Sequence, residues 1–318
     1  MIRVAAGIDI GGTNTVFGLV DEKGKILAKD KVSTQDFRTP KGFVNAVSKK
    51  INLLFRDYSE RVKNSRLIGL GIGAPTGNFF RGTIEHAPNM PWKGIIPIAD
   101  YFKDKLKIKT LLTNDANAAA LGEMIFGGAK KMNDFIFITL GTGVGSGIVS
   151  NGKLVYGHDG FAGEIGHVIV ERNGRLCGCG RRGCLEAYCS AGGFVVTFEG
   201  KQAAGIKKQE SGNTRVSAKE IYELARKGNK KAKDAFNYTG EILGFALANS
   251  VAYSSPEAIF LFGGLAQARD LIFNPVKKSF EKNLLNIYKN KIKILPSQLK
   301  ENNAAILGAS SLIFKEEK

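Results

Sequence analysis

Two stretches of the chain share one pattern of apolar strands and glycine-rich turns. Residues 4–10 are almost entirely apolar and lead into a turn at residues 11–14. Residues 135–140 lead in the same way into a turn at residues 141–143. Each turn is followed by a second apolar strand, a polar hairpin turn and a third short strand. A motif that occurs twice, at distant points of one chain, predicts two related α/β lobes.

The rest of the chain alternates between helix and strand patterns. Apolar residues at helical spacing, as at Phe43, Val47 and Ile51, indicate helices, and short continuous apolar runs bounded by turn residues indicate buried strands. Ser217 and Glu220 have the spacing of a capping box and predict the start of a further helix. We predict helices over residues 43–58, 116–126, 236–253 and 304–314, and buried strands over residues 67–73, 109–112 and 259–262.

These elements divide naturally into two lobes. We expect a small α/β lobe over residues 1–115 and a large α/β lobe over residues 116–302, with a C-terminal helix in residues 303–318 that packs back on the small lobe. No low-complexity linker separates the lobes, which indicates that the chain crosses between them more than once.

Composition favours a soluble cytoplasmic enzyme. No apolar run approaches the length that spans a membrane, and four clustered cysteines favour a metal site in a reducing compartment over a disulfide framework. The 318 residues carry a formal net charge of +17, which favours anionic partners such as nucleotides, sugar phosphates or polyphosphate. Because Lys and Arg are scattered, without a basic arm, we expect a solvated basic surface and no nucleic-acid partner.

Three cysteines and one histidine have the spacing of a zinc site. Cys177, Cys179 and Cys184 lie close together among glycines, and His167 precedes them by a short segment. Three thiolates and one neutral imidazole suit tetrahedral zinc, and four protein ligands leave no position for a catalytic water. The sequence therefore predicts a structural zinc, with Cys189 as the alternative fourth ligand in place of His167.

Carboxylates accompany each of these motifs. Glu164 and Glu186 flank the zinc ligands, so folding of the loop around the metal is expected to bring the two carboxylates together. Asp9 ends the first strand and can hold Mg²⁺, through water, beside the turn that follows. Asp115 stands at a strand-to-helix junction, where an aspartate either caps the helix or serves as a base, and the segment itself favours neither role.

The two glycine turns are candidate phosphate sites. Glycines let backbone N–H groups approach a phosphate closely, and the repetition of the turn makes this interpretation much stronger than one Gly-Gly-Thr turn would. The pattern is neither a Walker loop nor a dinucleotide fingerprint, because each turn leads into a strand rather than a helix.

Taken in order, these motifs resemble the ROK family (repressors, uncharacterised frames and sugar kinases), part of the superfamily of actin-like proteins, sugar kinases and heat-shock ATPases. The resemblance covers essentially the whole chain and is carried by residues 9–14, 114–115, 140–143, 160–167, 177–186 and 263–264. It implies two actin-like (ribonuclease H-like) lobes around an interlobe cleft, with the zinc loop in the larger lobe.

The resemblance also implies an activity: transfer of the γ-phosphoryl group of ATP to the 6-hydroxyl of an aldohexose, with glucose as the first choice. Asp115 would be the general base, Mg²⁺ would assist catalysis and Zn²⁺ would be structural. The implied sugar-binding residues are Asn89, Asn114, Asp115, Glu164, His167 and Glu186. The implied nucleotide-binding residues are Asp9, Gly11, Gly12, Thr13, Asn14, Gly141, Thr142, Gly143, Gly263 and Gly264.

Several alternatives stay open within this resemblance. N-acetylglucosamine, N-acetylmannosamine, mannose, fructose and allose are alternative acceptors, and polyphosphate is an alternative donor. A sugar-responsive repressor is less favoured, because both glycine turns are intact and the Asp9 turn lies so near the first residue that a helix-turn-helix segment is not expected before it. The resemblance further implies a homodimer or homotetramer built through the larger lobe.

Overall fold

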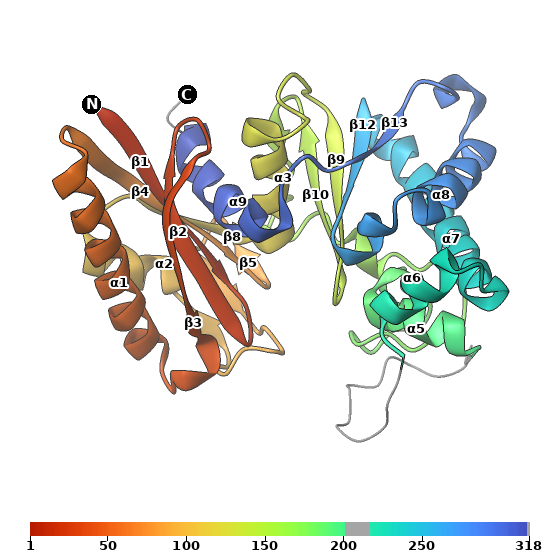
Figure 1. The fold of residues 1–318 in the computed structure, drawn as a ribbon, viewed down its shortest axis with the longest axis horizontal. Coiled ribbons are helices and arrows are strands. Elements are labelled where there is room, and N and C mark those ends of the chain that lie inside the picture. The colour runs from red at the N-terminus through yellow and green to blue at the C-terminus, as the bar shows by residue number, and fades with distance from the viewer. Residues whose placement is uncertain (201–215, 317–318) are drawn as a thin grey trace. The chain divides into compact units, whose positions relative to one another are not determined.

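The computed structural model describes residues 1–200 and 216–316, which form two compact units (Figure 1). The first unit comprises Met1–Met132, Lys153–Ala162 and Gln298–Lys318, and the second comprises Asn133–Gly152 and Gly163–Ser297. The first unit thus extends beyond the small lobe predicted over residues 1–115, since it also includes the following helix and the segment 153–162. Of the expected C-terminal helix, residues 317–318 lie outside the described residues.

The first unit contains a five-stranded sheet with the order β3-β2-β1-β4-β8. Neighbouring strands β1, β2 and β3 are antiparallel, whereas β4 is parallel to both β1 and β8. The strands are β1 (Ile2–Ile10), β2 (Asn14–Asp21), β3 (Ile26–Ser33), β4 (Ser65–Ala74) and β8 (Thr110–Asn114). Because β1, β4 and β8 run in the same direction, their carboxyl ends meet at one edge of the sheet.

Helices pack on the sheet of the first unit through alternating residues of its strands. Val4, Ala6, Ile8 and Ile10 of β1 join the apolar core that includes Phe43 of the first helix. The alternate residues of these strands face the other side of the sheet, where the C-terminal helix packs. The backbone of this helix lies directly against glycines of β1 and β4. The helices are α1 (Pro40–Arg61), α2 (Ile98–Leu106), α3 (Asp115–Phe126) and α9 (Glu301–Glu316).

Close backbone contact explains why α3 belongs to the first unit. A side chain on Gly122 of α3 would lie 3.0 Å from the Cα atom of Gly308 in α9, so the two helices cross with almost no side chain between them. The unit is completed by the 3₁₀ turn η1 (Thr34–Asp36) and by a small antiparallel sheet of β5 (Gly77–Asn78), β6 (Thr83–Glu85) and β7 (Ile95–Ile96).

A second five-stranded sheet repeats the strand order of the first sheet, and four of its strands belong to the second unit. This sheet has the order β11-β10-β9-β12-β13, in which β9 and β10 are antiparallel and β12 is parallel to both β9 and β13. The strands are β9 (Phe135–Leu140), β10 (Val144–Ser150), β11 (Lys153–Leu154), β12 (Ala258–Phe262) and β13 (Lys293–Pro296). The same topology occurs in both sheets, which confirms the duplication predicted from the sequence.

Helices α7 and α8 form the main helical layer of the second unit, and α4, α5 and α6 pack against α7 or α5 (Figure 1). Gly240 and Gly244 of α7 lie directly against α8 and allow the two helices to approach closely. The helical elements are α4 (Glu186–Cys189), α5 (Ala191–Glu199), α6 (Ala218–Arg226), α7 (Lys230–Ser254) and α8 (Asp270–Asn283), with 3₁₀ turns η2 (Ile165–His167), η3 (Gly264–Ala268) and η4 (Asn286–Tyr288).

Most predicted elements are confirmed, with shifted ends. The predicted capping box at Ser217 and Glu220 is present at the start of α6. Helix α1 begins before the predicted residue 43, because Pro40 occupies its first turn and the Thr39 side chain accepts a hydrogen bond from the Gly42 N–H. Among the described residues, none of the helices combines the length and apolarity needed to cross a membrane.

Candidate functional site

The first glycine turn closes tightly between β1 and β2. The Gly11 N–H donates to the Asn14 carbonyl at 3.0 Å, and the Thr34 N–H donates to the Thr13 carbonyl at 2.8 Å. Gly12 lies directly against the backbone of Asn89, so that a side chain at position 12 would overlap the Asn89 carbonyl. The structure therefore brings the sequence-predicted residues Asn89 and Gly12 together within the first unit.

Asp9 and Asp115 are neighbours at the carboxyl edge of the first sheet. Asp9 belongs to β1 and Asp115 follows β8, and Gly73 lies near the end of β4, the strand between them. A Cβ atom on Gly73 would lie 3.7 Å from Asp9 Oδ1 and 3.6 Å from Asp115 Cα. The two carboxylates are predicted site residues from distant parts of the sequence, and the parallel strands place them side by side.

The environment of these carboxyl groups raises both pKa values. Burial and, to a smaller extent, the charge of Asp115 raise the pKa of Asp9 to about 7. Asp115 remains accessible from solvent, while surrounding protein atoms desolvate its carboxyl and raise its pKa; hydrogen bonds from the backbone N–H groups of Ala116 and Asp115 oppose that rise. Two acidic groups that resist ionisation at one place favour a proton acceptor or a cation nearby.

The start of α3 shows how the two readings of Asp115 combine. Asn114 is the N-cap residue, and its side chain accepts from the Ala116 N–H at 2.9 Å. Asp115 is the first helical residue, and its Oδ1 atom accepts from the same N–H at 2.8 Å. Asn114 is thus the N-cap, and Asp115 is held at the helix start through its Oδ1 atom.

The second glycine turn is linked directly to the segment that contains Glu186. The Gly141 N–H donates to the Gly143 carbonyl at 3.0 Å. Glu186 Oε2 accepts from the Val144 N–H at 3.1 Å, and a Cβ atom on Gly143 would lie 2.6 Å from the same oxygen. A Cβ atom on Gly141 would meet nothing within 4 Å. This turn therefore has one side packed against Glu186 and one side open.

Gly263 and Gly264 lie next to the second turn within the same unit. They follow β12, which pairs with β9, and Gly263 has a positive φ of 101°. A Cβ atom on Gly263 would lie 2.6 Å from the Leu140 carbonyl oxygen, so only glycine allows this approach. Residues 141–143 and 263–264 thus meet at the ends of adjacent strands, as two parts of one candidate nucleotide site.

The predicted zinc ligands converge on one point. Cys177 Sγ lies 3.7 Å from His167 Nδ1, Cys179 Sγ lies 3.7 Å from Cys184 Sγ, and all four ligand atoms lie within 4.8 Å of one another. Zinc bonds of about 2.0–2.3 Å in a tetrahedron separate the ligand atoms by about 3.5–3.8 Å. The donor set and its spacing fit one zinc ion.

The surroundings of this cluster indicate which residue is the fourth ligand and whether the Cys177 thiol is protonated. Cys189 is buried in α4 and its thiol donates to the Thr239 carbonyl at 3.6 Å, away from the cluster, so the alternative that Cys189 replaces His167 is wrong. Burial raises the pKa of Cys177 to about 12, and this thiol therefore keeps its proton near neutral pH until a metal ion replaces it. Cys177 also donates to Glu186 Oε1 at 3.6 Å, which ties the cluster to Glu186.

Sequence reasoning missed two residues that shape the site. Gly73 lies beside both Asp9 and Asp115, and a glycine inside a buried strand is a signal of close approach by other groups. Ser146 of β10 holds the loop before η2: its hydroxyl bonds the Gly163 carbonyl and accepts from the Ile165 N–H at 3.2 Å. Glu164, between these two positions, is exposed.

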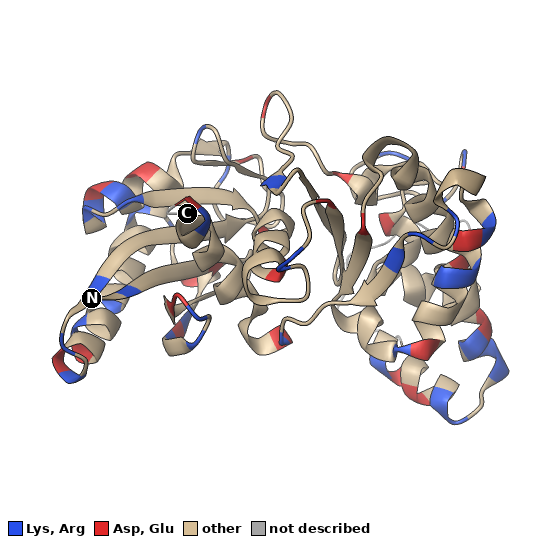
Figure 2. Ribbon diagram, turned by 90° about the horizontal axis from the view of Figure 1, so that it is seen from above, with Lys and Arg blue, Asp and Glu red and all other residues tan. Residues whose placement is uncertain are grey.

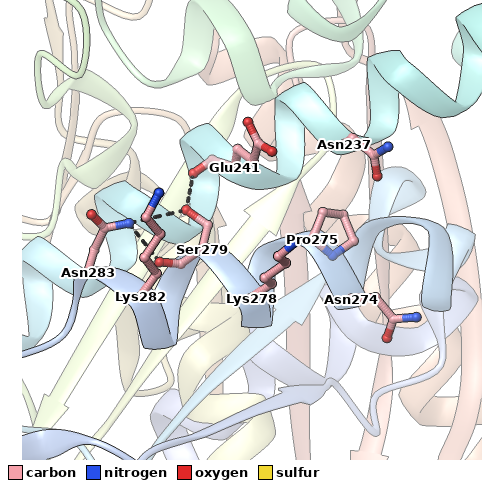
Figure 3. Close-up of a pocket in the computed structure, with 8 residues that line it drawn as sticks. All are labelled: Asn237, Glu241, Asn274, Pro275, Lys278, Ser279, Lys282 and Asn283. Atoms are coloured by element: carbon pink, nitrogen blue, oxygen red, sulfur yellow. Dashed lines mark hydrogen bonds between the residues drawn. The ribbon is translucent and has the colours of Figure 1, made fainter.

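A separate groove of about 510 Å³ lies between α7 and α8 (Figure 3). Within it, the Ser279 hydroxyl donates to the Glu241 carbonyl at 2.7 Å, and Asn283 Nδ2 donates to the Ser279 carbonyl at 2.7 Å. It is lined by Asn237, Glu241, Asn274, Pro275, Lys278, Ser279, Lys282 and Asn283. None of these residues belongs to the predicted site.

Comparison with known proteins yields one family. The model described as "ROK family" matches residues 5–316. A glucokinase of Streptomyces coelicolor is 34% identical over 315 residues, which is 96% of both chains. A xylose repressor of Bacillus spizizenii is 30% identical over 97% of this chain and 76% of its own length.

A solved structure is similar over the same extent. The ROK family glucokinase from Streptomyces griseus, in complex with glucose and AMPPNP, is 33% identical to this chain. The match covers 98% of this chain and 99% of the other, with a TM-score of 0.76.

Proposed function

The chain belongs to the ROK family, and we propose that it is an ATP-dependent glucokinase that phosphorylates the 6-hydroxyl of glucose. Sugar kinase activity is supported by the glucokinases that are about a third identical over nearly the full chain. The observation that carries the finer proposal is the position of Asp115, which stands beside Asp9 at the end of a buried strand and has a raised pKa. A carboxylate of this kind is a suitable proton acceptor for a hydroxyl group.

We assign sugar binding to residues of both units. In the first unit these are Asn89, which lies against Gly12, and Asn114, which precedes Asp115 in the sequence; in the second unit they are Glu164, His167 and Glu186, which belong to the zinc loop or its ends. Carboxylates and amides accept or donate hydrogen bonds to ring hydroxyls, and a buried group left unpaired by the wrong epimer is costly.

The role of the metal-binding loop is to hold these sugar-binding groups. His167 directs Nδ1 to the cysteine cluster, which leaves Nε2 for a sugar hydroxyl. Zinc would supply structural cross-linking at His167, Cys177, Cys179 and Cys184. Glu186 accepts from the Val144 N–H, so it is attached to the second glycine turn before any sugar binds.

We assign the nucleotide to the glycine turns. Backbone N–H groups and the hydroxyls of Thr13 and Thr142 would hold the β- and γ-phosphates, while Gly263 and Gly264 would border the adenosine. Magnesium would screen phosphate charge, and Asp9 would hold it through water. Under this assignment the protein contributes mainly alignment and a positioned base, the two things that phosphoryl transfer needs.

A coupled ADP-release assay tests the proposal. Glucose should give the highest kcat/KM in a panel that also contains N-acetylglucosamine, N-acetylmannosamine, mannose, fructose and allose. Asp115→Asn should lower kcat by about 10²–10⁴-fold while it still binds the sugar, because it removes the proton acceptor and keeps the shape. Asp104→Asn, an exposed position in α2, is the matched control and should behave as wild type. Near-normal turnover in Asp115→Asn would refute the assignment of Asp115 as the base. A higher kcat/KM for another sugar of the panel would refute the assignment of glucose as the substrate.

A sugar-responsive repressor is the second candidate, because a xylose repressor is 30% identical over 97% of this chain. A mobility-shift assay with DNA from upstream of the chain's own gene separates the two. A sugar-dependent shift in a protein without turnover would favour the repressor.

A further inference from the structure

Arg175 is a fully buried cation in the middle of the zinc loop. Its relative exposure is 2%, and it is among the largest fully buried side chains of the described residues. It precedes the ligand Cys177 by two positions, although nothing in the metal-ligand spacing requires an arginine there. Burying a guanidinium is costly unless its hydrogen-bonding groups are satisfied, and the buried Nε atom of Arg175 has no hydrogen-bond partner. The contacts of its Nη1 atom therefore indicate what the side chain does.

The guanidinium group bonds three neutral acceptors on two helical elements. Arg175 Nη1 donates to the Ala187 carbonyl at 3.3 Å, to the Gly193 carbonyl at 3.0 Å and to the Thr197 hydroxyl at 2.9 Å. The guanidinium carbon lies 4.6 Å from the centre of the Tyr188 ring, and the Tyr188 hydroxyl accepts from the Arg175 backbone N–H at 3.0 Å. Arg175 thus fastens the zinc loop to α4 and to the start and middle of α5.

The helical segment held by Arg175 is the one that contacts the second glycine turn. Glu186 adjoins Ala187 and accepts from the Val144 N–H. The Ala191 N–H, at the start of α5, donates to the Gly141 carbonyl at 2.8 Å. Two hydrogen bonds therefore connect this segment to residues 141–144, and both begin within a few residues of an acceptor of Arg175.

We propose that Arg175 is a positioning residue that holds Glu186 and the Gly141–Gly143 turn at the zinc loop. The proposal rests on the proposed kinase function for its kinetic consequences. Arginine suits this position because its planar group reaches three acceptors while its face stacks on Tyr188. Lysine is able to keep the charge and one bond, and methionine is able to keep only the volume of the side chain.

Three variants test the proposal: Arg175→Lys, Arg175→Met and, as control, Arg172→Met, which alters an exposed arginine of the same loop. In zinc-loaded Arg175→Met, KM for glucose and KM for ATP should both rise by about tenfold or more, because Glu186 and the turn are displaced. Arg175→Lys should recover part of both values. A role in packing alone would lower Tm and the zinc content but leave both KM values of the zinc-loaded fraction at wild type.

Hydrogen exchange supplies a measurement that does not depend on turnover. In Arg175→Met, or in Arg175→Lys if the methionine variant does not fold, the amides of residues 141–146 and 186–193 should exchange faster, while those of β12 should not. Unchanged exchange at residues 141–146 together with unchanged KM values would overturn the proposal. If the wild type phosphorylates no sugar, the proposed function fails, and the exchange result still decides the role of Arg175.

Discussion

At the scale of residues, the pair Asp9 and Asp115 predicts how activity depends on pH. The pKa of Asp9 is raised to about 7, and that of Asp115 is raised above its ordinary value, both mainly through desolvation. A carboxyl group with a raised pKa is still protonated at a pH where an ordinary aspartate, with a pKa of about 3.9, is ionised. A general base in that state cannot accept a proton.

We therefore expect kcat/KM for glucose to fall as pH decreases, on a limb whose midpoint lies well above pH 4. Magnesium near Asp9 should move that limb to lower pH, because a cation favours the ionised form. The measurement is the pH profile of kcat/KM at two magnesium concentrations, with enzyme stability checked at each pH. Constant activity down to about pH 4 would contradict the assignment of Asp115 as the base.

Replacement by alanine should have different effects on stability and on nucleotide binding at two glycines of the repeated turns. Gly12 lies against the backbone of Asn89, whereas a Cβ atom on Gly141 has open space around it. Gly12→Ala should cost about 1–3 kcal/mol of stability, because the Asn89 backbone must move. Gly141→Ala should leave Tm unchanged but raise KM for ATP, because the methyl group occupies the open side of the turn. Thermal unfolding and nucleotide kinetics of both variants check this, and a large loss of stability in Gly141→Ala would contradict it.

The role of a residue was predictable where a sequence motif marks it. It was not predictable where folding brings residues from distant parts of the sequence into contact. The three cysteines of the predicted zinc site follow from spacing, since a short loop must fold around its own donors, whereas the choice of His167 over Cys189 required the structure. The bond from Val144 to Glu186 and the burial of Arg175 depend on segments that meet only after folding. No local pattern of residues 141–144 or 173–176 contains that information.

At the scale of elements, the zinc loop has little regular structure to stabilise it. Between η2 and α4, the described backbone pairing is limited to isolated bridges, Ile169 with Cys184 and Leu176 with Arg182, and to turn hydrogen bonds. A metal ion would therefore contribute much of the order of this loop, because binding at folded ligands is coupled to folding. Loss of one ligand should affect the whole loop and, through Glu186, the sugar site.

We expect Cys179→Ser to lose most of its zinc, to melt roughly 5 °C lower or more, and to show a higher KM for glucose. Cys189→Ser is the matched control, since Cys189 is a buried thiol of the same segment that lies outside the cluster. It should retain zinc and the wild-type KM. Elemental analysis, thermal unfolding and kinetics on the two proteins test this, and a zinc-free Cys179→Ser protein with unchanged KM would refute the role of the loop.

The helices and strands were predictable from the periodicity of apolar residues. The apolar runs of β1, β4, β9 and β12 and the helical spacing of α1 are visible in the sequence. The sequence also predicts a C-terminal helix packed on the small lobe, but not that glycines of β1 and β4 admit the backbone of α9, because these residues lie far apart in the sequence.

At the scale of the whole molecule, the repeated strand order was predictable because both copies keep the same glycine turn. The boundaries of the two units along the sequence were not predictable, because α3 has the pattern of an ordinary helix. Its close crossing with α9 at Gly122 and Gly308, which places it in the first unit, becomes visible only in three dimensions.

The charge of the molecule bears on the choice of phosphoryl donor. The net charge of +17 is large, yet Figure 2 shows Lys and Arg spread over both units with acidic residues among them. A polyphosphate chain needs a continuous row of cations to be held in one register, whereas scattered cations give only weak attraction that salt removes over about 8 Å at 0.15 M ionic strength.

ATP, by contrast, would be held by backbone groups of the two turns, which salt screens little. We therefore expect ATP to be the better donor, and its advantage over long-chain polyphosphate to grow when ionic strength is raised from about 0.15 to 0.5 M. The measurement is kcat/KM for each donor at both salt concentrations with saturating glucose. Polyphosphate turnover that equals that of ATP at high salt would show that a specific binding track exists and that the donor assignment is wrong.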